Sequence, residues 1–294
     1  MKFRSFRSTA RLGLTLIELV VVIAILAVLA AMVIPRLDFL KTQAEHSASA
    51  STQADLGSMI QTYKASSGYY PTFDMLVDDA GSLYSKLQAQ TAGAFLETWT
   101  VPAAGGPPDG SWYRSLTEAG FKNGYRHSTS ATNASASGTS PADIENQATS
   151  GTLVLAVVKS TGGDASQLGA AIRNAIYPGV ATYVPGNNGP DGVAGGGDDV
   201  AATTTSTGAG VVPDNKKLVV LGIGPKSSLL SKVMVTAPTS AMTVDDPAAT
   251  YCRYLAVFEV NQNGTAASLK MITDHRGRQV GARIDQYKAA SAVN

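Results

Sequence analysis

The chain has 294 residues, of which 44% are hydrophobic, so it holds enough apolar material for a buried core. Its 23 basic and 22 acidic residues leave a formal net charge of +1, which argues against general nucleic-acid binding. The single cysteine, Cys252, excludes an intrachain disulfide. It stands in a stretch typical of a strand, Tyr251 to Phe258, and we expect a buried, inert thiol there.

The first residues form a basic leader that ends at Gly13. The leader carries Lys2, Arg4, Arg7 and Arg11 and no acidic residue. Positive charge on one flank of an apolar segment keeps that flank in the cytoplasm. We therefore expect residues 1–13 to be a cytoplasmic leader peptide and the rest of the chain to face outward.

An apolar run follows the leader and contains one acidic residue near its head. The residues from Leu14 to Glu18 lead into a stretch from Leu19 to Ile34 without a polar side chain. As a helix, Leu14 to Ile34 would span about 31 Å, close to the hydrocarbon core of a bilayer at about 30 Å. We expect a transmembrane helix over residues 14–37. A carboxylate near the head of such a helix is costly, up to about 2.5–3.5 kcal/mol when it lies at the centre, so Glu18 predicts a functional role.

Two simpler interpretations account for part of this pattern. A secretory signal peptide has a shorter apolar core and a small-residue cleavage site after it, and no clean A-x-A follows this run. A plain single-pass anchor explains the length and the basic flank. It does not explain Glu18.

The segment Gly13 to Glu18 resembles the class III signal of type IV pilins and pseudopilins, and Pro35 stands where that family has a helix-kinking proline. The resemblance implies that a prepilin peptidase cuts after Gly13 and that the new N-terminal residue, Leu14, is methylated. It also implies a single-pass inner-membrane protein with its head outside the cytoplasm, which enters a filament after assembly. The implied partners are other pilin or pseudopilin subunits, the peptidase, the inner-membrane assembly platform and membrane lipid.

The chemistry of Leu14 and Glu18 supports a role in the assembly of subunits. Cleavage would leave a positive amine on Leu14, and Glu18 lies about one helical turn further along. Both charges are unfavourable in lipid when alone, so Glu18 is expected to pair with the Leu14 amine of a neighbouring subunit. A buried pair of this kind sets register between subunits more than it adds stability.

The sequence after the apolar run predicts the soluble half of the same helix over residues 38–66. Gly68 and Pro71 end it, and the stretch Ser66 to Thr72 resembles the segment that ends the long helix in many pseudopilins. Beyond it we expect a short helix at 82–92, a loop at 95–110 and an exposed or mobile loop at 128–140.

The rest of the chain predicts an α+β head over residues 67–294. The expected fold is pilin-like, with a long N-terminal helix packed on an antiparallel β-sheet that has enlarged loops. The expected elements are a strand or buried helical turn at 153–158, a helix at 167–176 and strands at 217–223, 254–260 and 267–273. The last two strands are expected to form a hairpin around the turn Asn261 to Gly264.

One glycine-rich loop, residues 187–200, is a candidate calcium site. Calcium prefers several oxygen ligands, and Asp191, Asp198 and Asp199 supply carboxylates among glycines that can turn carbonyl groups inward. The loop resembles the calcium loop of major type II secretion pseudopilins, which implies calcium as a cofactor. A flexible turn is the alternative interpretation. The loop is not an EF-hand, because the alternating ligands and the terminal Glu are missing.

No catalytic pattern stands out. His46, His127 and His275 lie in unrelated contexts, and the chain has no H-E-x-x-H, G-x-S-x-G or P-loop motif. The stretch Asp274 to Arg278 is expected to be a solvated hairpin end. The sequence therefore predicts a non-enzyme: a structural subunit of a type IV pilus or a type II secretion pseudopilus. The alternative is a membrane-tethered extracytoplasmic adhesion or binding protein that uses the same signal.

Overall fold

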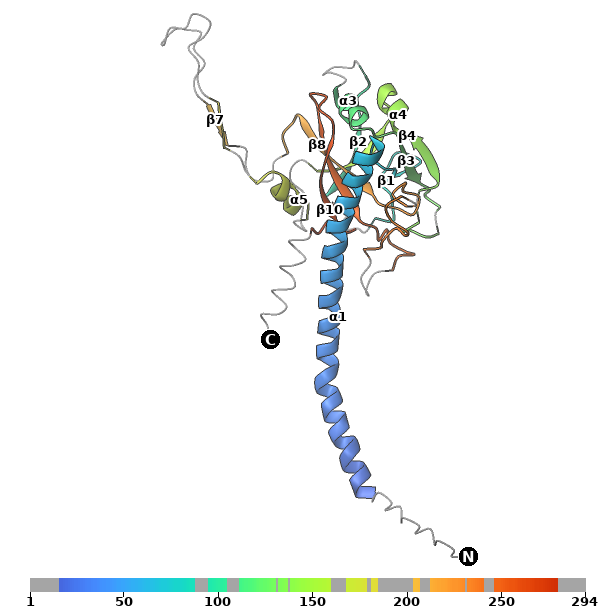
Figure 1. Ribbon diagram of the computed structural model, residues 1–294, viewed down its shortest axis with the longest axis vertical. Helices are drawn as coiled ribbons and strands as arrows, with labels where there is room; N and C mark the ends of the chain where they lie inside the picture. Colours follow the sequence, from blue (N-terminus) through green and yellow to red (C-terminus); the bar gives the residue numbers. More distant parts are fainter. Residues whose placement is uncertain are drawn as a thin grey trace, which may run out of the picture. The chain divides into compact units, whose positions relative to one another are not determined.

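The computed structural model has a mixed α+β fold with one long N-terminal helix and one large sheet (Figure 1). It describes residues 16–87, 95–104, 111–130, 132–136, 138–159, 168–178, 181–184, 203–206, 212–230, 232–240 and 246–279. Two compact units divide the chain, Met1–His46 and Ser47–Asn294, and each is described by itself. We call the second unit the head.

Helix α1 runs over Leu16–Ser67. Its first turn carries Glu18 and its last turn carries Lys64, an arrangement that complements the helix dipole. The helix continues through Pro35, which cannot donate a main-chain hydrogen bond. It ends where Gly68, at φ 79°, donates its N–H to the carbonyl of Lys64 at 2.8 Å. The predicted end at residue 66 is therefore confirmed to within one residue.

The sequence also predicts that the first part of α1 spans a membrane. Among the residues that the structure describes, no helix combines the length and the apolar character needed to cross a bilayer.

Eight strands form the main sheet of the head, and antiparallel pairs predominate. The sheet order is β10-β9-β8-β1-β3-β4, with β5 pairing both β8 and β2, and β1 and β3 are parallel. The strands are β1 (Phe73–Asp78), β2 (Leu96–Thr100), β3 (Asn123–His127), β4 (Ser140–Asp143), β5 (Val154–Val158), β8 (Lys216–Gly222), β9 (Leu255–Asn261) and β10 (Ser268–Thr273).

The remaining described elements are three short helices and a separate hairpin. The helices are α3 (Ser111–Glu118), α4 (Ile144–Ser150) and α5 (Leu168–Ile176), and the hairpin pairs β6 (Ala181–Val184) with β7 (Thr203–Ser206). Asp143 caps the N-terminus of α4 by accepting from the N–H of Asn146 at 2.9 Å. The expected helix at 167–176, the strands near 217–223 and 254–260 and the final hairpin are confirmed.

The core lies on both faces of the sheet. On one face, Leu56, Ile60 and Tyr63 of α1 pack with aromatic residues that include Phe258. On the other face, Ile172 of α5 belongs to a second buried cluster. The strand β9 is apolar almost throughout because its alternate side chains enter both clusters.

Three expectations for the middle of the chain are corrected. The helix expected at 82–92 is wrong for residues 82–87, which form a bridge and turns; residues 88–94 lie outside the described residues. The loop expected at 95–110 contains β2, whose five residues pair with β5. The loop at 128–140 is partly packed, because Ala134 and Ser135 are buried.

Candidate functional site

Glu18 lies in the first turn of α1 among exposed apolar side chains. These apolar side chains are between 47% and 81% exposed in the isolated chain. An apolar surface of this extent marks a contact with protein or membrane. The members are Leu16, Ile17, Leu19, Val20, Val21, Val22, Ile23, Ile25, Leu26, Val28, Leu29, Met32, Ile34, Leu37 and Leu40.

The other residues predicted from the sequence to form a processing or metal site lie outside the described residues. These are Gly13 and Leu14 at the expected cleavage position, and Asp191, Asp198 and Asp199 of the expected calcium loop. Within the described part of the chain, no group of three or more His, Cys, Asp or Glu residues could hold a metal ion. The cleavage site and the calcium loop therefore stay predictions.

The head contains a buried polar cluster that the sequence did not reveal. His127 at the end of β3 lies with its Nε2 3.9 Å from Oδ2 of Asp74 on β1, and both side chains are 1% exposed. The ring of Tyr84 stacks on His127 at 4.1 Å between ring centroids. Tyr251 donates its hydroxyl to Oδ2 of Asp74 at 2.9 Å. Asp74 and Tyr84 lie more than forty residues before His127, and Tyr251 lies more than one hundred residues after it, so no local motif could have indicated the cluster.

Burial controls the protonation of this cluster. It lowers the pKa of His127 to about 4, although the negative charge of Asp79 acts in the opposite direction. Burial, together with the charge of Asp74, raises the pKa of Tyr84 and of Tyr251. His127 is therefore neutral at pH 7. Its Nε2 and the hydroxyl of Tyr84 are buried without a hydrogen-bond partner among the described residues.

A second polar cluster links β8, β9 and β10 to the end of α5. Lys216 and Lys270 place their Nζ atoms 3.2 and 3.3 Å from Oε1 of Glu259, and Tyr177 donates its hydroxyl to Oε2 at 2.5 Å. Burial would raise the pKa of Glu259, but the hydroxyl of Tyr177 and the two lysines together hold it below its usual value. The cluster satisfies a buried carboxylate and fastens α5 to the sheet.

The turn after β10 is buried, which corrects the expectation of a solvated hairpin end. Asp274 is 0% exposed and His275 is 1% exposed. The carboxylate of Asp274 accepts from the N–H of Arg276 at 3.0 Å and from Nε of Arg278 at 2.9 Å. His275 lies with its Nδ1 2.7 Å from the hydroxyl of Ser240. The turn is a fixed part of the head.

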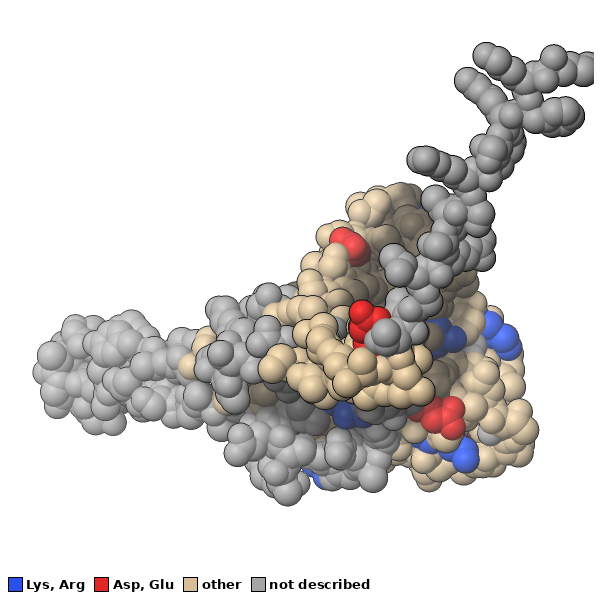
Figure 2. All heavy atoms as spheres, turned by 90° about the horizontal axis from the view of Figure 1, so that it is seen from below, with Lys and Arg blue, Asp and Glu red and all other residues tan. Residues whose placement is uncertain are grey.

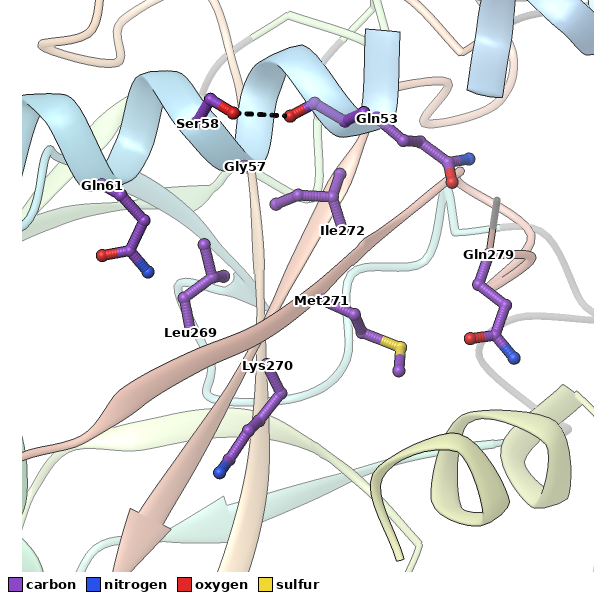
Figure 3. A pocket seen from close by; sticks show the side chains of 10 residues that line it. Gln53, Gly57, Ser58, Gln61, Leu269, Lys270, Met271, Ile272 and Gln279 are labelled. Atoms are coloured by element: carbon purple, nitrogen blue, oxygen red, sulfur yellow. Dashed lines mark hydrogen bonds between the residues drawn. The ribbon is translucent and has the colours of Figure 1, made fainter. Parts of the chain in front are cut away.

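A groove of about 570 Å³ lies between α1 and β10 (Figure 3). One wall is α1 from Gln53 to Gln61, the other is β10 from Leu269 to Ile272, and Gln279 also lines it. The dashed line in Figure 3 is the hydrogen bond from Ser58 Oγ to the carbonyl of Ala54, at 3.3 Å. Its lining combines amide and apolar side chains with the hydroxyl of Ser58 and the ammonium group of Lys270.

On the face of the molecule shown in Figure 2, acidic and basic side chains of the described residues lie interspersed among uncharged ones. The described residues of this face form no cluster of one sign that would attract a polyanion.

Comparison with known proteins gives a match at the N-terminus. The family described as the prokaryotic N-terminal methylation motif matches residues 9–34. The chain carries the signal of type IV pilins and pseudopilins. No curated protein and no solved structure matches the chain.

The matched segment joins the expected cleavage position to the exposed apolar part of α1. It includes Gly13, Leu14 and Glu18 and ends at Ile34. The signal implies processing by a prepilin peptidase, assembly with other pilin subunits and a membrane-anchored protein of the pilin type. It indicates a structural rather than a catalytic protein.

Proposed function

We propose that this protein is a structural subunit of a type IV pilus or a type II secretion pseudopilus. Prepilin peptidase removes residues 1–13, and Leu14 becomes the methylated N-terminus. Before assembly the subunit resides in the inner membrane with its head outside the cytoplasm, and the assembly platform transfers it into the filament. The observation that carries this proposal is the match of the methylation motif to residues 9–34.

The apolar part of α1 supports a role in the filament core. Its large side chains are exposed in the isolated chain, so they need neighbours to cover them. The small residues Ala24, Ala27, Ala30 and Ala31 recur along the same segment and let neighbouring helices approach closely. Burial of such side chains in a helix bundle stabilises by about 25 cal/mol for each Å² of apolar surface removed from water.

Glu18 sets the axial position of each subunit relative to its neighbours in the helix bundle. Surrounded by apolar side chains, its carboxylate is costly to bury unless it meets a positive charge. The amine that cleavage creates on Leu14 of a neighbouring subunit supplies that charge. The pairing is specific because an axial shift of one subunit against the next would leave both charges unpaired.

The test replaces the carboxylate by an amide. Glu18→Gln removes the charge and keeps the shape, so the chain should be processed normally and yet be absent from sheared filaments. Glu45→Gln makes the same change further along α1 and should assemble like the natural chain. Mass spectrometry of the membrane fraction reports processing, and immunoblotting of the sheared fraction reports assembly. Normal assembly of Glu18→Gln would contradict the pairing mechanism.

The same experiment addresses the alternative, a membrane-tethered adhesion or binding protein with the same signal. A tethered binding protein has no use for register between subunits, so Glu18→Gln would leave its location and its binding unchanged. Loss from filaments therefore supports the structural subunit.

Calcium binding by the loop 187–200 is a further part of the proposal. Asp191, Asp198 and Asp199 would supply carboxylate oxygens, and the glycines between them would let main-chain carbonyls turn toward the ion. With one cysteine in the chain, a bound ion would take the place of a disulfide in holding the outer loops.

A further inference from the structure

The end of α1 is surrounded by lysine side chains that lie over tyrosine rings. The ammonium group of Lys64, in the last turn of the helix, lies 4.1 Å from the ring centroid of Tyr70. The ammonium group of Lys122 lies 5.0 Å from the ring centroid of Tyr69. Contacts of this kind occur about once in 70–80 residues of an average protein, so their concentration around one helix end is a specific feature of this surface.

A third lysine belongs to the same surface through two adjoining rings. The ammonium group of Lys232 lies 5.1 Å from the ring centroid of Tyr63, and that ring meets Tyr69 edge to face at 5.9 Å. Among the described residues, no carboxylate forms an ion pair with Lys64, Lys122 or Lys232. Their positive charges are therefore not neutralised within the described part of the head.

A fourth lysine adjoins the segment that follows α1. The ammonium group of Lys226 lies 5.0 Å from the ring centroid of Tyr125, and the carbonyl of Lys226 accepts from the hydroxyl of Thr72 at 3.3 Å. Lys122, Lys226 and Lys232 are exposed, and Lys64 is partly exposed. We call these four residues the lysine patch.

An apolar loop of Val233, Met234 and Val235 directly follows Lys232. Val235 is 92% exposed, and no other large apolar side chain in the described part of the head is exposed. The carbonyl of the buried Leu229 accepts from the N–H groups of Val233 and Met234 at 3.0 and 3.2 Å. The backbone that carries Val235 is therefore fixed by hydrogen bonds.

The apolar loop decides which class of anionic partner this surface fits. The cores of protein interfaces are depleted in lysine. Nucleic acid accepts lysine at its phosphates but offers no apolar layer to Val235. A bilayer accepts both kinds of side chain, because anionic headgroups lie directly above the acyl chains. Tyrosine rings are also suited to the headgroup level, where one end is apolar and the other is wet.

We propose that the lysine patch and the apolar loop form a docking surface for an anionic lipid bilayer. The ammonium groups contact headgroup phosphates, and Val235 enters the boundary of the acyl chains. Each lysine near such a membrane raises the affinity about fivefold, and salt screens this contribution. The residues of this surface belong to the head, so the proposal does not rest on the assembly of α1 into a filament.

The test uses the full chain held in nanodiscs of phosphatidylcholine, so that the apolar part of α1 is already covered. The nanodiscs are fixed to a biosensor, and the retention of added vesicles is measured. One set of vesicles contains phosphatidylcholine and phosphatidylglycerol in equal parts, and the other contains phosphatidylcholine alone. The natural chain should retain the anionic vesicles and release the neutral ones.

Three variants and one matched control assign the binding to this surface. Lys122→Gln and Lys232→Gln should each weaken the apparent affinity for anionic vesicles about fivefold. Val235→Ser keeps the charge and should weaken it at least about fivefold, because it removes the apolar group. Lys86→Gln lowers the net charge equally and should change nothing, since Lys86 bonds through its carbonyl to the N–H of Tyr251 and lies outside the patch.

Two results would overturn the proposal on the side of charge: equal retention of neutral and anionic vesicles, or equal effects of Lys122→Gln and Lys86→Gln. A third result would overturn it on the side of the apolar loop. If Lys122→Gln weakens retention but Val235→Ser does not, the lysines attract a polyanion such as a nucleic acid, and the surface is not a site for a bilayer.

Discussion

Acidification should weaken the head through one buried side chain, His127. The side chain is 1% exposed, and its ring stacks on Tyr84. Burial lowers its pKa from 6.5 to about 4 in the folded protein. When the chain unfolds, the ring regains water and its ordinary pKa. The unfolded state therefore binds more protons than the folded state between pH 6.5 and pH 4, and stability falls as the pH falls through that window.

The size of the effect follows from the two pKa values. One pKa unit corresponds to about 1.4 kcal/mol, so a shift from 6.5 to about 4 amounts to about 3 kcal/mol. Above pH 6.5 this loss of folding stability is absent, and near pH 4 most of it is present. A loss of this size is a large share of the about 5–15 kcal/mol that typically stabilises a domain.

The assay compares the full chain with His127→Phe. Phenylalanine keeps an aromatic ring to stack on Tyr84 but cannot take up a proton. Guanidinium unfolding is followed by fluorescence of the chain's two tryptophans, Trp99 and Trp112, which pack edge to face at 5.2 Å in the head. Between pH 7.5 and pH 4 the free energy of unfolding of the natural chain should fall by about 3 kcal/mol more than that of the variant.

Comparison of the two chains removes the contribution of other groups. The carboxyl groups near the ring, those of Asp74 and Asp79, are present in both chains, and so are Tyr84 and Tyr251. Equal losses of stability in the natural chain and in His127→Phe would refute the assignment of the acid sensitivity to His127.

Three further predictions concern the head. Tyr251→Phe removes a buried hydroxyl that donates to Asp74, so it should lower the free energy of unfolding by about 2 kcal/mol. Tyr84→Phe removes a buried hydroxyl without a partner among the described residues, so it should leave the free energy of unfolding unchanged or raise it by up to about 1 kcal/mol. Equal effects of the two substitutions in denaturation would contradict this. Gly222→Ala should cost about 2 kcal/mol or more, because its Cβ would overlap the hydroxyl of Tyr251; a wild-type melting temperature would count against the packing. EGTA should lower the melting temperature of the full chain but not of Asp198→Ala; a melting curve that EGTA leaves unchanged in the natural chain would sink the calcium proposal.

Local signals predicted the end of α1 and the last hairpin of the sheet well. Gly68 and Pro71 indicated the end of α1, and the turn at Asn261 to Gly264 indicated the hairpin of β9 and β10. In both places neighbours in sequence decide the structure. The N-terminal signal was likewise readable because its residues are contiguous.

Contacts between distant residues were not predictable in the same way. The strand β2 contains polar residues and is formed by its pairing with β5, more than fifty residues away. Charges at Asp274 and Arg278 suggested solvent, but the two residues bond each other inside the turn. His127 looked isolated in sequence because its partners Asp74 and Tyr84 approach it only in the folded sheet.

The central claim is that the chain is a processed pilin-type subunit, and the N-terminus of the mature protein tests it most directly. Intact-mass measurement and N-terminal sequencing should be done on protein made in cells that contain a prepilin peptidase. The account predicts a chain that begins at N-methylated Leu14, and a Gly13→Leu variant that keeps its leader. A mature chain that begins elsewhere, or a Gly13→Leu variant processed like the natural one, would contradict it.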